Sequence, residues 1–359
     1  MAKLGDVYAA LPGYRAALHQ SRFDISLTAG AGTTPFRGAF SAFATPLSNV
    51  HATGIGIRVK NGKIQDENYV IKLYVFEKID LGTDVPEIAR QFEGVPVDVE
   101  HLPVQMALQR KRTRQPAAGA GIPPNRLRKR PVIGGLSIAP LGMSYVGTLG
   151  CFVTRRVADS LHVFALSNNH VLANVNSLAA GTPIVQPGPE FAAPSSGDVF
   201  AELSEFVTID FATSQFNRPT NRFDAAIARV TDANLVKQGQ MFGIAGYDPT
   251  SVVVAKPGMT VTKSGRTTGV TRGRVTAVGV NGVQINYGTQ TNPRLATFND
   301  TIEIVSDGDS PFSMPGDSGS VILEEASGKP VALLFAGDGH TTTACSFAGV
   351  CRQFQVDPV

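Results

Sequence analysis

The sequence predicts a mainly β fold, in which a small α+β module precedes a larger all-β region. Glycine and proline number 37 and 23 among 359 residues, so turns are frequent along the chain. Hydrophobic residues make up 43 % and charged residues 17 %, a composition too apolar for a disordered chain. From Val132 onward, short runs of β-branched and aromatic residues recur at the spacing of a sandwich or barrel. The length exceeds that of one typical domain, so at least two domains are expected.

Residues 1–108 are predicted to form the α+β module. A helix is expected around Leu11 and Tyr14, with Pro12 in its first turn, where a missing amide costs little. A hairpin is predicted over residues 55–76, with its turn at Asn61-Gly62.

Two further elements complete the predicted module. Asp84 followed by Glu87, with Gly94 beyond, gives the start and stop signals of a short helix. Residues 95–99 then form a third strand. None of these elements carries a visible catalytic group.

Residues 132–359 are predicted to form the all-β region. They show no βαβ alternation, repeat or phosphate-binding glycine loop, which argues against a nucleotide-dependent enzyme. The predicted strands are 147–154, 161–166, 198–207, 225–230, 259–264, 271–280, 282–286, 301–305, 319–323 and 331–336.

Residues 109–131 separate the two units and concentrate positive charge. Eight Lys or Arg and no acidic residue lie between Arg110 and Arg130, although the net charge of the chain is only +3. The run also contains eight proline, alanine and glycine residues between Pro116 and Pro124, so an exposed linker is predicted. A nucleic-acid contact is the alternative, because these charges could neutralise phosphates. No aromatic residue interleaves with the charges, so nucleic acid is not the expected partner.

The chain is expected to be cytoplasmic. No stretch approaches the length of a membrane span, and the N-terminus lacks the apolar region of a secretory signal. Three cysteines, Cys151, Cys345 and Cys351, fit reduced thiols better than a disulfide framework. A bridge between Cys345 and Cys351 is the alternative.

A serine flanked by glycines is the first sign of chemistry. Ser318 lies in the run Gly316-Asp317-Ser318-Gly319. A serine hydroxyl becomes a nucleophile only beside a base, and the oxyanion that it creates needs amide donors. Gly316 frees the backbone so that its amide and that of Ser318 can form an oxyanion hole. An ordinary glycine-rich turn is the alternative interpretation.

A base and its partner lie upstream. His170 follows the predicted strand 161–166, and Asp224 opens an apolar run, where its carboxylate could orient the imidazole. Alone, either residue could be structural. Together with Ser318 they appear in the order His, Asp, Ser, which is the chymotrypsin order and differs from that of α/β-hydrolases and subtilisins.

With these motifs in order, residues 132–359 resemble the trypsin-like serine peptidases, most closely the intracellular bacterial and plant branch typified by the plant narrow-leaf protease. The resemblance implies two six-stranded β-barrels with a triad of His170, Asp224 and Ser318 in the cleft between them. Residues 54–63 and 94–99 resemble the N-terminal module of that branch. The motifs that carry the resemblance are 166–173 (LSNNHVLA), 186–189 (QPGP), 224–228 (DAAIA) and 263–269 (KSGRTTG).

Two departures from the secreted relatives bear on setting and activation. Val171 follows the histidine where those relatives have a cysteine, which agrees with an intracellular protein. Residues 132–135 (VIGG) mimic the activation site of secreted trypsins, in which a new N-terminus pairs with the Asp before the nucleophile. Pro131 disfavours cleavage after Arg130, so processing there is not expected.

The resemblance also implies a specificity pocket. It places Phe312, six residues before the nucleophile, at the pocket floor and Gly337 at its wall. Such a pocket would favour apolar or small side chains.

The expected function is a serine endopeptidase that cleaves protein or peptide substrates through an acyl-enzyme, with no metal or organic cofactor. The resemblance is compatible with a homo-oligomer. The rival hypothesis is a non-catalytic protein that binds peptides or a partner on the same fold.

Overall fold

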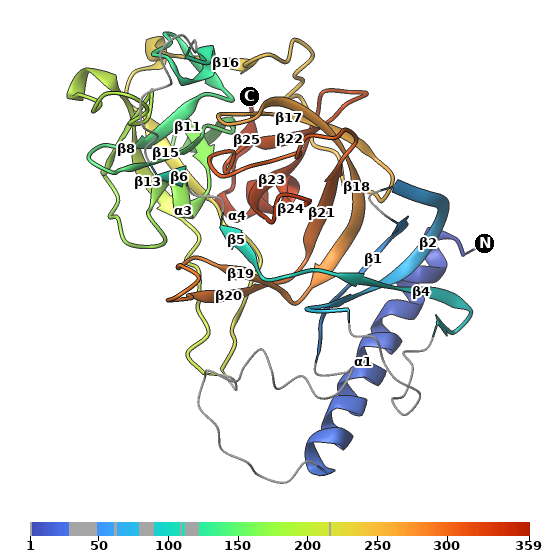
Figure 1. Ribbon diagram of the computed structural model, residues 1–359. Coiled ribbons are helices and arrows are strands. Elements are labelled where there is room, and N and C mark those ends of the chain that lie inside the picture. The colour runs from blue at the N-terminus through green and yellow to red at the C-terminus, as the bar shows by residue number, and fades with distance from the viewer. Residues whose placement is uncertain are drawn as a thin grey trace.

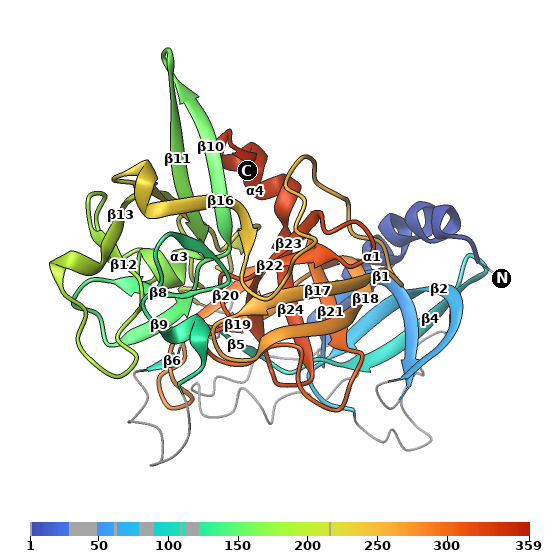
Figure 2. The same ribbon diagram turned by 90° about the horizontal axis from the view of Figure 1, so that it is seen from above.

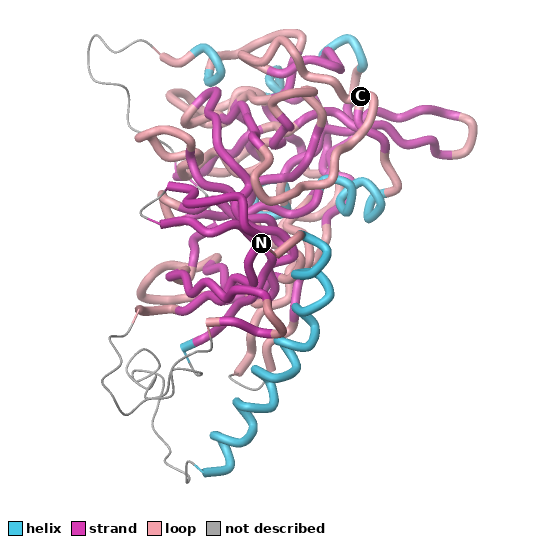
Figure 3. The backbone as a smooth tube through the Cα atoms, turned by 90° about the vertical axis from the view of Figure 1, so that its right-hand side faces the viewer, coloured by secondary structure: helices cyan, strands magenta, loops and turns pink. Residues whose placement is uncertain are grey.

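The computed structural model describes residues 2–28, 49–60, 63–78, 90–107, 110–111, 122–214 and 217–359. In this part of the chain strands far outnumber helices, and the long α1 (Leu4–Thr28) lies at the edge of the molecule (Figures 1 and 3). The prediction of a mainly β fold is confirmed. None of the described helices is both long and apolar enough to cross a membrane.

Six strands of the C-terminal half close into an antiparallel barrel. The ladder runs from β17 through β18, β21, β24, β23 and β22 and returns to β17. Each of these strands is therefore paired with a barrel neighbour on both sides over part of its length. The strands are β17 (Thr260–Gly265), β18 (Gly269–Asn281), β21 (Thr301–Ser306), β22 (Val321–Glu324), β23 (Pro330–Gly337) and β24 (Thr341–Ser346).

The two faces of this barrel wall pack against different parts of the chain. On β22, Val321 and Leu323 join the apolar cluster that includes α4 (Phe347–Phe354) and Phe164, a residue of the first half of the all-β region. Ile322, which points to the opposite face, joins the cluster that includes α1 and the N-terminal hairpin. The barrel is therefore the centre on which both neighbouring units are built.

The remaining strands of the all-β region, on the left of Figure 1, belong to a nine-stranded sheet, which we call the first strand group. Ile138, Phe152, Phe200 and Leu203 lie in its own apolar core, and the closure of this sheet into a second six-stranded barrel stays a prediction. A parallel pair, β7 (Val132–Gly134) and β16 (Val236–Met241), lies beside it. The sheet order is β25 (Asp357–Pro358), β10 (Cys151–Val157), β11 (Ser160–Ser167), β15 (Ala226–Val230), β13 (Val199–Phe206), β12 (Pro183–Val185), β8 (Ser137–Pro140), β9 (Tyr145–Thr148) and β6 (Arg110–Lys111).

Every strand predicted in the all-β region has a counterpart, with one break. The predicted strand 147–154 is divided between β9 and β10, because Leu149 and Gly150 turn to bond the carbonyls of Leu136 and Leu166. The sequence did not predict eight short strands of the described part of this region, namely β7, β8, β12, β14 (Thr220–Asn221), β16, β20 (Leu295–Phe298), β24 and β25.

The N-terminal module shares a sheet with the barrel. The predicted hairpin is β1 (Val50–Lys60) with β2 (Lys63–Val75), and the predicted third strand is β4 (Val95–His101), which lies parallel to β2. β1 also pairs with β18, so the module continues the barrel's sheet. The predicted helix over residues 84–92 falls mostly outside the described residues, but its end forms β3 (Gln91–Phe92), which pairs with β4.

The position of Pro12 in the first helix differs from the prediction. α1 begins at Leu4, so Pro12 lies in its interior and not in its first turn. Pro12 is exposed, whereas Leu11 and Tyr14 are buried against the hairpin. Because the proline lies on the outer face, water can bond the carbonyl that it leaves without a helical donor.

Residues 122–130 of the predicted linker are partly exposed but are bound to both neighbouring units. Asn125 is buried and its Nδ2 donates to the carbonyl of Gly265 at 2.8 Å in the second barrel. Arg130 donates to Gln186 Oε1 at 2.7 Å and to the carbonyl of Asp198 at 3.0 Å in the first strand group. These guanidinium and amide donors fix the segment across both units. Residues 112–121 lie outside the described residues, and the predicted division at 108 and 131 stays a prediction.

A buried ammonium joins the module to the barrel. Lys72 of β2 has no exposed side-chain surface, and its Nζ lies 2.6 Å from Glu100 Oε1 on β4 and 3.3 Å from Glu303 Oε1 on β21. Thr276 Oγ1 donates to the same Glu303 oxygen at 2.6 Å. Burial raises the pKa of Glu100 to about 7, although the nearby Lys72 charge opposes this shift.

We expect this cluster to make stability fall with rising pH. The Glu100 carboxyl ionises at its ordinary pKa of 4.5 in the unfolded chain and at about 7 in the folded chain. Between these values the folded state holds more protons, so the free energy of unfolding decreases, by about 1–3 kcal/mol in all. Urea unfolding of wild type and Glu100→Gln from pH 4 to 8 measures this, and the variant should lack the decrease. Glu202→Gln, at an exposed position on β13, is the control and should keep the wild-type profile. A wild-type profile for Glu100→Gln would contradict the prediction.

Candidate active site

The loop after β11 holds His170. The strand ends at Ser167, and a single turn, α3 (Asn169–Leu172), carries the histidine with no exposed surface. Asn168 Nδ2 donates to the carbonyl of Asp224 at 2.6 Å, and Asn169 Nδ2 donates to the carbonyl of Val207 at 2.7 Å. These amides fix the turn, so the two asparagines before His170 have a structural function.

His170 and Asp224 form a buried pair. β11 pairs with β15, with Ser167 opposite Ala226. Asp224, two residues before β15, therefore lies beside the turn that follows β11. His170 Nδ1 is 2.5 Å from Asp224 Oδ2, and the His170 amide donates to Asp224 Oδ1 at 3.2 Å. Neither side chain is exposed to solvent. The carboxylate therefore fixes both the backbone and the ring of the histidine.

Tyr287 is a third member of this arrangement that the sequence did not reveal. Its hydroxyl donates to Asp224 Oδ2 at 2.8 Å, and its ring lies edge-on to His170 with centroids 6.0 Å apart. Burial and the Asp224 charge raise the pKa of Tyr287, so the hydroxyl keeps its proton as a donor. The only sequence signal was its position directly after the predicted strand 282–286.

Ser318 lies on a loop between the two units. Its hydroxyl donates to the carbonyl of Phe335 on β23 at 3.4 Å, and its own carbonyl accepts from the amide of Thr148 on β9 at 2.8 Å. Gly319 has a φ of +92°, and a Cβ there would collide with Ser167 Oγ and the Thr148 carbonyl. Glycine thus allows the loop to pack against the end of β11, three residues before His170.

The two amides predicted to form an oxyanion hole are available. Gly316 has a φ of +102°, and its carbonyl accepts from Thr148 Oγ1 at 2.8 Å. Among the hydrogen bonds between described residues, the amides of Gly316 and Ser318 donate none, whereas the intervening Asp317 amide donates to Met314. The amides on either side of Asp317 are therefore the ones that could donate to an oxyanion.

The side chain of Asp317 anchors this loop to the turn between β17 and β18. Its Oδ1 accepts from the Thr267 amide at 2.7 Å, and its Oδ2 accepts from Thr268 Oγ1 at 2.7 Å and from the Met314 amide at 2.9 Å. The ammonium of Lys263, also fully buried, lies 3.7 Å from Oδ2. A buried carboxylate is stable only with such partners.

These contacts make a new N-terminus unnecessary for placing Ser318. Val132, which would be that terminus, is buried in β7 and pairs with Val236 of β16. Asp317 already has hydrogen bonds and a cation from residues 263–268. In the sequence, residues 263–268 stood out only because they resemble a family motif. In the structure they bind the Asp317 carboxylate.

Arg266 links the two units behind the Ser318 loop. It is fully buried, and its guanidinium binds both carboxylate oxygens of Glu190, with Nε 2.5 Å from Oε1. Ser137 Oγ of β8 donates to the same Oε1 at 2.5 Å. The Arg266 amide donates to Thr148 Oγ1 at 3.0 Å, the hydroxyl that binds Gly316. The pair therefore connects residues of the first unit to the loop of the second.

The structure gives the predicted pocket residues different surroundings. Phe312 is 1 % exposed and packs in the apolar cluster of the second barrel, with the Lys263 ammonium 5.7 Å from its ring centroid. These are the surroundings of a core side chain. The assignment of Phe312 to the pocket floor counted six residues back from Ser318, and that count came from the resemblance alone. Gly337 ends β23 and is buried. The specificity pocket stays a prediction.

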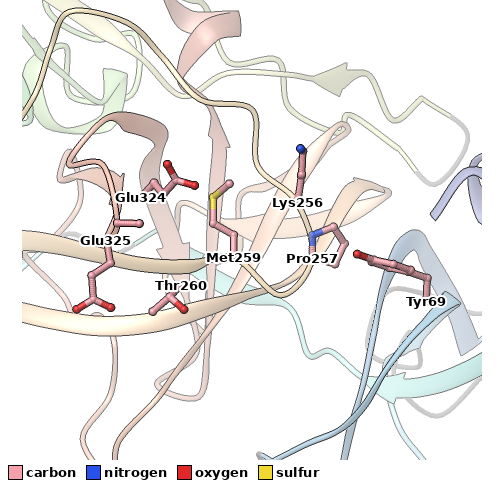
Figure 4. Close-up of a pocket in the computed structure, with 8 residues that line it drawn as sticks. Tyr69, Lys256, Pro257, Met259, Thr260, Glu324 and Glu325 are labelled. Carbon is pink, nitrogen blue, oxygen red and sulfur yellow. The ribbon is translucent and has the colours of Figure 1, made fainter. Parts of the chain in front are cut away.

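A surface pocket of about 490 Å³ lies elsewhere, beside β17 and the end of β22 (Figure 4). Figure 4 shows Tyr69, Lys256, Glu324 and Glu325 among its lining residues. None of the residues discussed above lines it. Among the described residues, no group of His, Cys, Asp or Glu side chains could hold a metal ion.

The chain is similar to one protein family and to several solved structures. Residues 197–346 match the model of the Nal1 C-terminal domain family. The chain is similar to the solved structure of Thermobifida fusca protease A, with 16 % identity and a TM-score of 0.44 over 64 % of this chain and 98 % of that one. It is similar to Cellulomonas bogoriensis chymotrypsin, with 17 % identity and a TM-score of 0.43 over 64 % and 98 %. For a glutamic acid-specific serine protease the identity is 22 % and the TM-score 0.43 over 64 % and 100 %. No curated protein matches the chain.

We expect the buried Arg266–Glu190 pair to be far more sensitive to mutation than a surface pair. Arg266→Met leaves the Glu190 carboxylate buried without its cation, which should lower the free energy of unfolding by about 3–5 kcal/mol. The matched control is Arg272→Met, which breaks an exposed pair with Glu325 at 2.7 Å and should cost less than about 1 kcal/mol. Urea unfolding measures both. Equal costs for the two variants would show that the buried pair does not hold the units together.

Proposed function

We propose that the protein is a serine endopeptidase of the trypsin-like class, in the intracellular branch typified by the plant narrow-leaf protease. The observation that carries the proposal is the buried His170–Asp224 pair, at the end of the strand against which the Ser318 loop packs. The family match over residues 197–346 supports it, because this range includes Asp224 and Ser318.

In the proposed mechanism, Ser318 Oγ attacks the carbonyl carbon of a peptide bond while its proton moves to His170 Nε2. The amides of Gly316 and Ser318 bind the oxyanion that forms. His170 then protonates the leaving amine, and the acyl-enzyme is hydrolysed by water that the same imidazole deprotonates. Asp224, held by Tyr287, orients the ring and stabilises its cationic form. Neither a metal nor an organic cofactor takes part.

We propose protein or peptide substrates and a cytoplasmic setting, with homo-oligomers compatible with the family. Three cysteines are free in the structure, including Cys345 and Cys351, which supports a reducing compartment over the alternative disulfide.

One observation favours a non-catalytic peptide-binding protein as the second candidate. The Ser318 hydroxyl donates to the Phe335 carbonyl, a contact that a structural serine would also make. A fluorophosphonate distinguishes the two candidates, because only an activated serine reacts with it.

Substitution of any triad member should abolish peptide hydrolysis. We expect Ser318→Ala, His170→Ala and Asp224→Asn each to lower kcat by about 10⁴-fold or more, and double variants to lose little more, because the three residues act as one unit. Hydrolysis of a peptide library by the folded variants is the measurement. The control is Ser327→Ala, a serine of the turn between β22 and β23, which should keep wild-type rates. Near wild-type hydrolysis by folded Ser318→Ala would overturn the assignment.

Tyr287→Phe tests the positioning of Asp224. This variant keeps the ring beside His170 and removes only the hydroxyl that donates to Asp224 Oδ2. We expect kcat to fall by about 3- to 30-fold with little change in KM, since one charge-assisted hydrogen bond is lost away from the substrate. Steady-state kinetics on a peptide substrate measures this. Tyr145→Phe is the matched control, because its hydroxyl donates to the Val171 carbonyl and not to the triad. A loss confined to KM would contradict a positioning function.

A further inference from the structure

The edge of β23 next to Ser318 is occupied by the chain itself. β5 (Gln105–Ala107) pairs antiparallel with the end of β23, with Ala107 opposite Ala336 and Met106 opposite Gly337. These two barrel residues follow directly after Phe335, whose carbonyl accepts from the Ser318 hydroxyl. β5 thus lies along the strand that leads away from the proposed nucleophile.

Among the described strands, only β5 covers this part of the edge. β24 lies along the opposite edge of β23 from Ala332 to Gly337. β22 lies on the same edge as β5, but its pairing with β23 ends at Leu333. Without β5, the backbone groups of Ala336 and Gly337 would be open to another extended chain.

The chain then pairs with the other side of the proposed site. β6 (Arg110–Lys111) pairs antiparallel with β9, with Arg110 opposite Val146. Two residues further along β9, the Thr148 amide donates to the Ser318 carbonyl. In Figure 1, β5 lies below the C-terminal barrel, whereas β6 lies within the first strand group. Ser318 therefore contacts both strands whose edges are covered, β23 by β5 and β9 by β6.

The crossing between these edges is short. Ala107 and Arg110 are three residues apart, so their Cα atoms are at most about 11 Å apart. Leu108 and Gln109 lie outside the described residues. From β5 to β6 the chain therefore passes from the edge of β23 to the edge of β9.

An extended substrate of the proposed enzyme needs this same geometry. Its acyl portion must lie along one strand edge and its leaving portion along the other, with the reacting carbonyl at Ser318. We propose that residues 105–107 and 110–111 occupy the substrate groove as an internal pseudosubstrate, so that the edges of β23 and β9 are the substrate-binding edges and are closed in this state. The inference rests on the proposed peptidase function and specifies its binding edges and its regulation.

The docking of β5 has one strong anchor and one defect. The Gln105 side chain is fully buried, and its Oε1 accepts from Thr343 Oγ1 of β24 at 2.5 Å. On its other side β5 pairs with β19 (Val283–Asn286). The Gln105 Nε2 atom, however, is buried with no hydrogen-bond partner among the described residues. An unsatisfied donor weakens docking, so an incoming peptide that lacks it can compete.

The test compares a small fluorophosphonate with a peptidyl phosphonate in the full chain. The small reagent needs only an activated Ser318, whereas the peptidyl reagent also needs the two strand edges. We expect wild type to react with the peptidyl reagent at least tenfold more slowly than Met106→Pro and Ala107→Pro, whose prolines break the β5 ladder. Gln91→Pro, in the exposed edge strand β3, is the matched control and should react as wild type does.

A milder variant covers the case in which the prolines prevent folding. Thr343→Val keeps the shape of the side chain and removes the hydroxyl that binds Gln105, so it should speed the peptidyl reaction about three- to tenfold. Thr341→Val, on the same strand, should not. A synthetic peptide of sequence 103–112 should slow the reaction of the opened variants, and a scrambled peptide should not.

The possible failures are distinguishable. If wild type reacts with the peptidyl reagent as fast as folded Met106→Pro and Thr343→Val do, the groove is open and the pseudosubstrate is refuted while the peptidase assignment stands. If neither reagent labels any of these chains, Ser318 is not activated, and the proposed function and the inference both fail.

Discussion

The carboxylate of Asp317 is the constraint on which the proposed site depends. It lies fully buried next to Ser318, and four backbone or hydroxyl donors and one ammonium from residues 263–268 and 314 compensate its charge. Removing those donors would leave a charge in a place with no access to water, at a cost of several kcal/mol. The backbone between Met314 and Ser320 therefore has little freedom. The positive φ values at Gly316 and Gly319 are the local consequence.

The same physics joins the three parts of the molecule. Lys72 binds carboxylates from the module and from the barrel, Arg266 binds Glu190 across the two strand groups, and His170 binds Asp224 within the first group. Buried ion pairs add little net stability compared with apolar contacts of the same volume. They do penalise every arrangement that separates the partners, because each leaves an unpaired charge in the interior. Apolar clusters supply the attraction between the units, and these pairs select one way of docking them.

The sequence predicted what local pattern encodes. Runs of β-branched and aromatic residues gave the strands, and the glycines around Ser318 together with the order of His170, Asp224 and Ser318 gave the candidate site. Tyr287, Lys263 and Arg266 were not assigned functions, because each acts on a residue more than 50 positions away or across a barrel. Pro12 was misplaced because a proline on an exposed helix face is tolerated by solvation, which sequence spacing does not reveal. Likewise, the basic run near residue 130 looked like a tether, since most of the acceptors that bind its guanidinium groups are side chains and backbone carbonyls more than 50 positions away in the sequence.

The strands β5 and β6 follow from a general difficulty of strand-edge recognition. A groove that binds extended peptides through backbone groups presents open edges, and open edges pair with any extended chain, including other copies of the same protein. Covering them with a segment of the chain itself removes that hazard, and the tether keeps the local concentration of the segment high. The cover must also be weaker than a sheet interior, or no substrate could displace it. Pairing is limited to two residues with each of β23, β19 and β9, and a buried amide is left unsatisfied at Gln105, so the cover is short and imperfect.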